Sequence, residues 1–385
     1  MRRGFGALAI AACIAALAAQ PQGVARQPQG KGKAPADPAA TWARAVDQAK
    51  AFLVARQADD GTWSKAASPG ITGIVVVGLL RSGAMKADDP PVVRALKFIE
   101  SLVDEKTGHL AGSGARVGLQ NYLTSVNLSA LVLADASGRY RPTITRAADF
   151  LKQLQWDESE GKTPQDPIYG GAGYGGGSRP DMSNTSFFLD ALVTAGVSRT
   201  DPAFKRAVIY VSRSQNFKNE HNDQPWAGTI NDGSFIYTAS GDTRGTTLND
   251  GRKPGYGSMT YAGLKDLLIC GVPKDDPRCR KALDWLRGHY SVDINPGMQA
   301  GVGPRGLYYY LMTMSKCLTE LGEPTFSDAE GAAHDWKADI LRALASRQRK
   351  DGSWQNDISA WMETEPDLCT AYALITLGYC KPEKK

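Results

Sequence analysis

The strongest constraint on the fold is a repeat within the chain. Four prolines are each followed five residues later by an alanine and, three residues after that, by an aromatic residue. These copies begin at Pro90, Pro142, Pro202 and Pro277. Their apolar positions have helical spacing, and proline is favoured in the first turn of a helix, where its missing N–H breaks no hydrogen bond. Each copy is therefore predicted to be one helix of a repeating unit.

A second set of helices, richer in small and aromatic residues, is predicted to alternate with the first. Its members span residues 70–83, 122–135, 184–196, 258–270, 307–321 and 370–377. Degenerate copies around Ala49 and Ile340 bring the first set to six as well, so about twelve helices in six hairpins are expected. No alternating apolar and polar run is long enough for a sheet, so the predicted fold class is all-α. Six hairpins could form an open solenoid, but the small second helices favour a closed (α/α)6 toroid.

Two nearly identical turn motifs occur at opposite ends of this repeat. Gln57, Gly61 and Trp63 belong to the first, and Gln348 and Trp354 belong to the second. The shared Asp-Gly pair is typical of a turn, and the Gln and Trp side chains are expected to tie the helix end to its neighbour. A glycine-rich segment, residues 169–177, lies between them. These motifs resemble the QW and prenyltransferase repeats of the squalene cyclase and protein prenyltransferase superfamily. The resemblance covers residues 42–380 and implies a terpenoid cyclase-like α/α toroid with an apolar or isoprenoid-like ligand in its central cavity.

The chain is predicted to have three parts. Residues 1–19 combine a basic start, a short apolar run and small residues, which is typical of an export signal peptide. Residues 20–41 are rich in Gln, Pro, Gly, Ala and Lys, a composition typical of a flexible linker. Residues 42–381 form the predicted toroid domain, in the periplasm or outside the cell. A lipoprotein signal ending at Cys13 and a twin-arginine signal are alternatives. No later segment has the length of a transmembrane helix.

The positive charge of the chain lies outside the predicted toroid. The sequence has 45 Lys and Arg against 40 Asp and Glu. Five of the basic residues and none of the acidic ones fall in residues 1–36, so the remainder is balanced at 45 − 5 = 40 of each sign. A basic groove is thereby disfavoured, and no nucleic-acid partner is predicted.

The reactions implied by the resemblance each require residues that this chain lacks. There is no Asp-x-Asp-Asp string, which supplies the acid of class II terpene cyclases, and no Asp-Asp-x-x-Asp string for magnesium diphosphate. Asp181 has Ser183 where a prenyltransferase zinc site needs cysteine, and Asp367 has Cys369 at that spacing but no histidine after it. No metal and no cofactor are therefore predicted. Whether the chain is an enzyme stays open; an enzyme of this fold would be cyclase-like or transferase-like.

Acidic residues before the second helices are the candidate catalytic groups. Glu363, Glu365 and Asp367 form an acidic cluster before the last of these helices, which could raise the pKa of one carboxyl, although an acidic first turn also simply favours a helix. Asp181 stands before an earlier one, and the candidates are Asp181, Glu365 and Asp367. A connection of about forty residues, 216–256, is long enough to be functional. Aromatic residues at Tyr122, Phe187, Tyr261 and 308–310 are expected on the inner wall. The candidate ligand-binding residues are Tyr174, His221, Trp226, Tyr256, Tyr309 and Trp361.

Two other functions remain open at this stage. Carboxylates and tyrosines at one mouth of a toroid would also suit a lyase or hydrolase that acts on polysaccharide. A noncatalytic scaffold could instead present the 216–256 loop to a protein partner. Cys270 and Cys279 bracket a predicted turn and form the candidate disulfide, with two free thiols as the alternative.

Overall fold

The computed structural model describes residues 37–65, 68–112, 117–241, 252–299 and 301–383. The predicted export signal and most of the predicted linker lie in residues 1–36, outside this described part. Helix α1 (Pro38–Arg56) begins before the expected domain boundary at residue 42, with Asp37 as its N-cap. Within the described ranges there are thirteen α-helices and one antiparallel pair of short strands, β1 (Phe326–Ser327) and β2 (Ala333–His334). None of these helices is long and apolar enough to cross a membrane.

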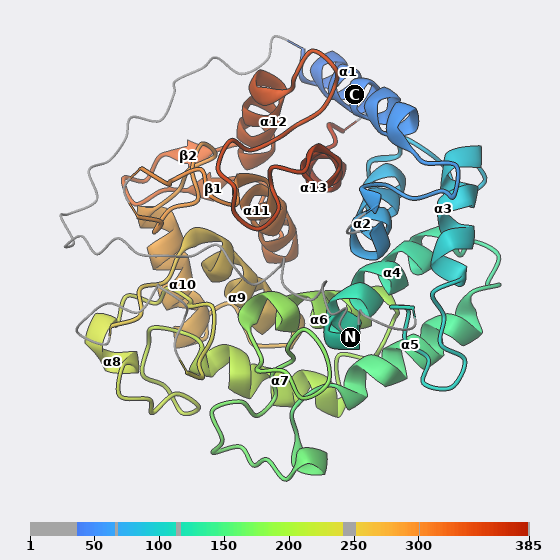
Figure 1. Ribbon diagram of the computed structural model, residues 1–385. Coiled ribbons are helices and arrows are strands. Elements are labelled where there is room, and N and C mark those ends of the chain that lie inside the picture. Colours follow the sequence, from blue (N-terminus) through green and yellow to red (C-terminus); the bar gives the residue numbers. More distant parts are fainter. Residues whose placement is uncertain (1–36, 66–67, 113–116, 242–251, 300, 384–385) are drawn as a thin grey trace, which may run out of the picture.

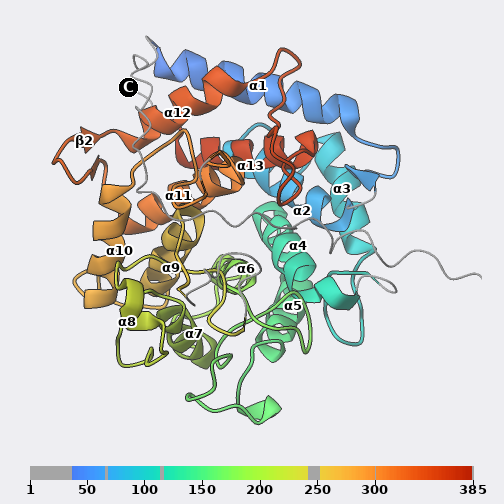
Figure 2. The same cartoon turned by 60° about the vertical axis from the view of Figure 1, so that its left-hand side comes forward.

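The helices form an inner and an outer set, as the repeat predicts (Figure 1). The inner helices are α2 (Ser68–Ser82), α4 (Gln120–Ala134), α6 (Met182–Thr194), α9 (Gly257–Ile269), α11 (Leu307–Leu321) and α13 (Pro366–Tyr379). The outer helices are α1, α3 (Pro90–Glu100), α5 (Arg141–Gln153), α7 (Pro202–Arg213), α10 (Pro277–Gly288) and α12 (Trp336–Arg347). Each inner helix contacts the next one along the chain, and α13 contacts α2. Helix α1 lies alongside α12, so the two ends of the helical chain are neighbours (Figure 2).

The repeat alanines mark the place where one hairpin packs against the next. Ala95, Ala147, Ala207 and Ala282 are fully buried on the outer helices. A glycine from the turn of the preceding hairpin lies against the backbone beside each of them. A side-chain carbon at any of these glycines would come closer than 3.0 Å to the carbonyl oxygen just before the alanine. The small residues of the repeat are therefore explained by backbone-to-backbone packing. The glycines are Gly61, Gly108, Gly170 and Gly233.

A threonine near the start of an inner helix fixes each of these turns in five of the six hairpins. The five hydroxyls accept a hydrogen bond from a turn N–H at 3.1 to 3.2 Å. The threonines are Thr72, Thr124, Thr185, Thr260 and Thr370. One of the donors, the N–H of Phe235, lies in the 216–256 loop directly after Asp232, Gly233 and Ser234. This segment is thus a further copy of the Asp-Gly turn, which inspection of the sequence did not detect.

Glutamine side chains join neighbouring hairpins. The amides of Gln57, Gln155 and Gln215 each donate to their own turn and to the first part of the next outer helix, at 2.8 to 3.1 Å. Gln348 makes the same pair of bonds, to Gly352 O and to Ala45 O in α1, both at 2.9 Å. The tryptophan indoles, by contrast, donate to their own preceding helix, not to the neighbour as expected.

The predicted disulfide is not formed. Cys270 and Cys279 are both free thiols, and so are the other three cysteines of the described residues. Cys279 is buried on α10 and Cys270 is the residue that ends α9. The alternative of two free thiols is the one that the structure shows.

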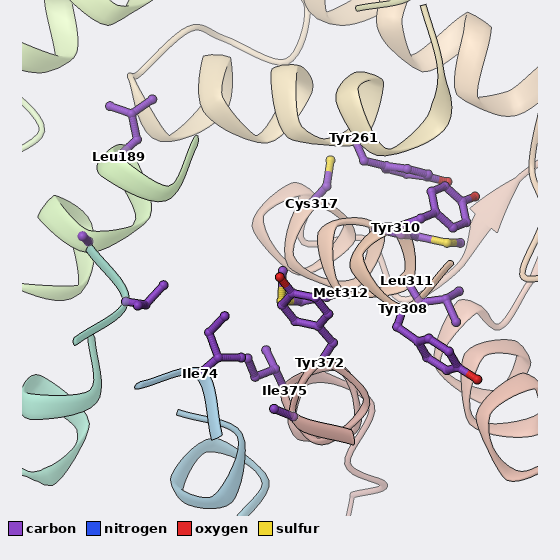
Figure 3. Close-up of a cluster of buried hydrophobic side chains, with 14 of the residues drawn as sticks. Ile74, Leu189, Tyr261, Tyr308, Tyr310, Leu311, Met312, Cys317, Tyr372 and Ile375 are labelled. Atoms are coloured by element: carbon purple, nitrogen blue, oxygen red, sulfur yellow. The ribbon is translucent and has the colours of Figure 1, made fainter. Parts of the chain in front are cut away.

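Of the tyrosine run 308–310, only Tyr309 lies on the inner wall. Tyr310 packs against Tyr261 with ring centroids 5.8 Å apart, in the buried layer shown in Figure 3. Its hydroxyl donates to Ser291 O at 2.7 Å, and Tyr308 turns toward Gln355 O at 3.4 Å. Successive helix positions differ by about 100°, so three adjacent tyrosines cannot share a face. The prediction that all of them, and Tyr261, line the inner wall is wrong.

Substitution of Gly352 tests the contact between the last turn and the first helix. Gly352 has φ +88°, and an added side-chain carbon would lie closer than 3.0 Å to the carbonyl oxygen of Gln48. Gly271 has φ +87° but nothing within 4 Å. We expect Gly271→Ala to cost about 1–2 kcal/mol for the backbone conformation alone. Gly352→Ala should cost about 1–3 kcal/mol more because of overpacking. Urea unfolding of both variants measures the difference, and equal losses would contradict the packing of this turn on α1.

Candidate functional site

Aromatic side chains from four parts of the chain meet where the inner helices begin. We call this group the aromatic end. Tyr256 stacks on Trp361, with ring centroids 6.0 Å apart. The hydroxyl of Tyr256 is also close enough to Tyr309, Asp181 and Tyr174 for their charges to act on its pKa, which burial raises. The structure thus brings together five of the candidate residues named from the sequence. The aromatic end consists of Tyr174, Asp181, Tyr237, Tyr256, Tyr309 and Trp361.

Asp181 is the carboxyl group of the aromatic end. It is the N-cap of α6 and accepts hydrogen bonds from the backbone N and the side-chain Nδ2 of Asn184, both at 2.8 Å. The Tyr237 hydroxyl interacts with the same carboxyl. Burial raises the pKa of Asp181 to about 6, although these hydrogen bonds oppose the shift. A carboxyl with such a pKa exchanges a proton near neutral pH, so it can serve as an acid or a base.

The aromatic series continues from Tyr309 along the inner helices. Tyr309 lies 6.2 Å from Phe187 and 6.0 Å from Tyr372, measured between ring centroids. Phe187 in turn meets the edge of Tyr122 at 5.1 Å. Tyr122, Phe187 and Tyr309 are only partly buried, although they lie on inner helices. Phe187 and Tyr122 confirm the expected inner wall, whereas Tyr372 was not predicted.

Two of the candidate acids hold the ends of the helical chain together. Asp367 is buried and forms an ion pair with Arg56 at the end of α1. It also accepts a hydrogen bond from Ser64 Oγ at 2.7 Å. Glu365 lies 3.8 Å from the same guanidinium group. These contacts place Asp367 and Glu365 between α13 and α1. The two acids are therefore not part of the aromatic end.

His221 and Trp226 lie in another part of the 216–256 loop. The imidazole of His221 is 3.5 Å from Glu220, and burial lowers its pKa. Lys253 Nζ lies 5.5 Å from the centroid of the Trp226 ring. Trp226 is the N-cap of the short helix α8 (Ala227–Ile230), which is peripheral in both views (Figures 1 and 2). The structure thus separates these two candidate ligand-binding residues from the aromatic end.

Glu363 positions Trp361, a role that the sequence does not indicate. Its carboxylate accepts hydrogen bonds from Tyr309 N at 2.8 Å and Asn356 Nδ2 at 2.7 Å, at the start of α11. The side chain is fully buried, and burial raises its pKa to about 7. Trp361 and Met362 have φ of 52° and 62° and are 45% and 46% exposed. Glu363 therefore anchors a strained loop whose apolar side chains face solvent. The acidic run was visible in the sequence, but which acid is buried depends on the fold.

A group of charged residues lies farther along the inner helices. We call Asp190, Lys265, Asp266 and Lys316 the charged cluster. Lys316 Nζ is 2.8 Å from Asp190 Oδ2, Lys265 also pairs with Asp190, and Lys265 Nζ is 3.2 Å from Asp266 Oδ1. Ser186 Oγ donates to Asp266 at 3.1 Å. In the sequence, the signal that could have indicated this cluster is a charged residue at a similar position in each of three apolar helices. Without their packing, nothing in the sequence links these positions.

Two further observations concern metal binding and a hollow on the surface. No group of three or more His, Cys, Asp or Glu residues in them is arranged to hold a metal ion. An open hollow of about 560 Å³ lies between α1 and the start of α3, and none of the residues of the aromatic end lines it. Its lining includes Val54, Met85 and Pro91.

Asp181 should make the stability of the fold depend on pH. Its pKa is raised from 3.8 to about 6, so the folded state holds a proton that the unfolded state has released. Burial of Asp181 therefore costs nothing below pH 4 and up to about 3 kcal/mol above pH 6. Asp181→Asn keeps an N-cap residue, and we expect it to gain stability relative to the wild type as pH rises from 4 to 6.

Asp276 provides the matched control, because it is the N-cap of α10 and the Arg278 side chain lowers its pKa. Asp276→Asn should change in the opposite direction, losing stability relative to the wild type as pH rises from acid. Urea midpoints at several pH values measure both. A difference between Asp181→Asn and the wild type that stays constant from pH 4 to 7 would show that the Asp181 carboxyl has an ordinary pKa.

Comparisons with known proteins identify the fold. No protein-family model matches the chain, and no curated protein matches it. Among solved structures, a variant of the type II terpene cyclase MstE from Scytonema, in complex with geranylgeranyl dihydroxybenzoate, has a TM-score of 0.54 at 13% identity, covering 90% of this chain and 99% of that one. A glycosidase variant has a TM-score of 0.51 at 13% identity, covering 88% and 96%. A polysaccharide lyase has 0.50 at 9%, covering 88% and 97%. The chain therefore has an α/α toroid fold, which it shares with these terpene cyclase, glycosidase and lyase structures.

Proposed function

We propose that this protein is a closed ring of six helical hairpins that binds an apolar or isoprenoid-like ligand at the aromatic end. Closure of the ring is supported by the bond from Gln348 to Ala45 O. The packing of Gly352 on Gln48 and the contact between α13 and α2 support it as well. The proposal includes export of the chain, for which the composition of residues 1–19 is the basis.

The observation that carries the binding proposal is the exposed aromatic surface at one end of the inner helices. Tyr174, Trp361 and Met362 are three of the four large hydrophobic side chains that are exposed in the described residues. Trp361 stacks on Tyr256, and the rings of Tyr309, Phe187 and Tyr122 continue inward. Exposed apolar side chains that gather at one place are typical of a binding surface, and aromatic rings contribute a large area to it. The ligand named for MstE also carries an isoprenoid chain.

Binding, without a reaction, is the extent of this proposal. The acid string of class II cyclases is missing from the sequence, and Asp181 is the carboxyl that the described aromatic end supplies. Its pKa of about 6 would allow proton transfer, but it already accepts two hydrogen bonds as a helix cap. We therefore assign Asp181 to the binding surface.

A polysaccharide ligand is the second candidate. Sugar rings stack on aromatic side chains, and the aromatic end presents hydroxyl groups from Tyr174, Tyr237 and Tyr256 around one carboxyl. The electrostatic interactions of these hydroxyls with one another and with Asp181 contribute to the raised pKa values of Tyr237 and Tyr256. The fold likeness to a glycosidase and to a polysaccharide lyase is compatible with this alternative.

Substitution of Trp361 tests the proposed binding surface. Trp361 is half exposed, so Trp361→Ala should leave the fold intact while it removes a stacking surface worth about 2 kcal/mol, or roughly thirty-fold in affinity. Val54→Ala is the control, because Val54 is 40% exposed on the outer helix α1. Calorimetric titration with a long-chain isoprenoid alcohol and with a polysaccharide series measures the effect.

The two candidates give different results in this experiment. Binding of the alcohol that weakens in Trp361→Ala but not in Val54→Ala supports the apolar ligand. Binding of the saccharides alone favours the alternative. An affinity for the alcohol that Trp361→Ala does not change would contradict the assignment of the surface, and so would native protein whose lipid extract contains no enriched apolar molecule.

A further inference from the structure

We propose that the charged cluster binds the oxyanion head group of an amphipathic ligand whose apolar body lies along the aromatic series. The head group would be a carboxylate or a phosphate monoester. This inference rests on the proposed function, because it assigns a binding site to the head group of the same ligand. It concerns Asp190, Lys265, Asp266 and Lys316, none of which takes part in the aromatic end.

The charged cluster lies on the continuation of the aromatic series. Asp190 follows the first residue of α6 by eight positions, which corresponds to roughly 12 Å along the helix. Ser183, Phe187 and Asp190 are the partly exposed residues of that helix up to this point, and their spacing of four and three places them on one face. Lys316 Nζ lies 5.9 Å from the Phe187 ring centroid. A ligand that follows the rings inward therefore arrives at Lys316.

The cluster contains two ammonium groups and two carboxyl groups, and the ammonium groups share one of the carboxyls. Lys265 and Lys316 both pair with Asp190. An ammonium group has three donors, and Asp190 takes one of those of Lys316. Lys265 also pairs with Asp266, whose pKa burial raises to about 6, so this carboxyl takes up a proton more readily than an ordinary aspartate. When Asp266 holds a proton, two ammonium groups face the single carboxylate of Asp190, and an oxyanion supplies the second partner.

Lys316 is the cation that an incoming group can reach. Its side chain is 17% exposed, whereas that of Lys265 is 4% exposed. Burial lowers the pKa of Lys316, and the charges of Lys265 and Arg81 add to this effect while Asp190 opposes it. Arg81 lies over the Tyr379 ring at 4.8 Å, near the same end of the inner helices. The surroundings of Lys316 thus favour a further negative charge.

An independent observation also points to a ligand. Asp266 is fully buried, and its Oδ2 atom has no hydrogen-bond partner among the described residues. A buried polar atom without a partner is costly, so a structure rarely retains one without a function. A head group with both an anionic oxygen and an O–H, such as a phosphate monoester, could accept from Lys316 and donate to Asp266.

Binding of matched twelve-carbon probes tests the inference. Dodecanoate, dodecyl phosphate and dodecanol are titrated below their micelle concentrations into the full chain, in a calorimeter. We expect at least one of the two anions to bind about ten-fold more tightly than the alcohol, since a hydrogen bond to a charged group contributes about 1.5–3 kcal/mol. Comparison of the two anions distinguishes a carboxylate from a phosphate head group.

Variants then locate the effect at Lys316. Lys316→Met should lower the affinity for the anion to that for the alcohol and leave the alcohol unchanged, and Lys316→Arg should restore most of the preference. Lys50→Met is the control, because Lys50 lies on the outer helix α1 and pairs with Asp47 at 3.4 Å. The comparison of probes in the wild type needs no variant, so it decides the matter even if Lys316→Met does not fold.

Failure of this inference is distinguishable from failure of the proposed function. Equal affinity for all three probes would overturn the role of the charged cluster and leave the apolar binding surface standing. A loss of affinity in Lys316→Met that is the same for the alcohol and the anions would also overturn it, because it would show a structural role. If no probe binds, both proposals are wrong.

Discussion

The packing of one turn against the backbone of the next outer helix is the interaction on which this fold depends. It requires a glycine in the turn and a small residue on the helix, and a glutamine amide then bonds to both partners. Because the same contact recurs between Gly352 and Gln48, the last hairpin meets the first. The inner helices are brought to a common centre as a consequence, and their starts converge. The arrangement of the inner helices thus follows from a backbone contact, and the aromatic end follows from that arrangement.

Much of this arrangement is readable from the sequence because the contacts are local or repeated. The repeat of proline and alanine predicts the outer helices closely, and the segments rich in small and aromatic residues predict the inner helices closely. What the sequence does not reveal is which of several adjacent residues turns inward. Tyr309 lies on the inner wall while Tyr308 and Tyr310 pack behind it. Asp367 was a candidate acid, yet it pairs with Arg56, 311 residues away in the chain.

The charged cluster shows the same limit more strongly. Lys265 and Lys316 are single charges within apolar helices, and each by itself predicts nothing. They acquire a meaning only when α6, α9 and α11 place them around Asp190. Asp181 and Glu363 are comparable: both cap helices, and both have a raised pKa because the fold buries them. Burial, which decides the chemistry of these carboxyls, is a property of the assembled fold.

Photo-crosslinking tests the central claim, that the ring binds an amphipathic ligand along its inner aromatic series, most directly. A long-chain fatty acid with a diazirine in mid-chain is irradiated with the protein, and the labelled residues are identified by mass spectrometry. The account predicts labels on Phe187, Tyr309 and Tyr122, competed away by unlabelled ligand. Labels confined to the outer hollow between α1 and α3, at Val54 or Met85, would contradict it.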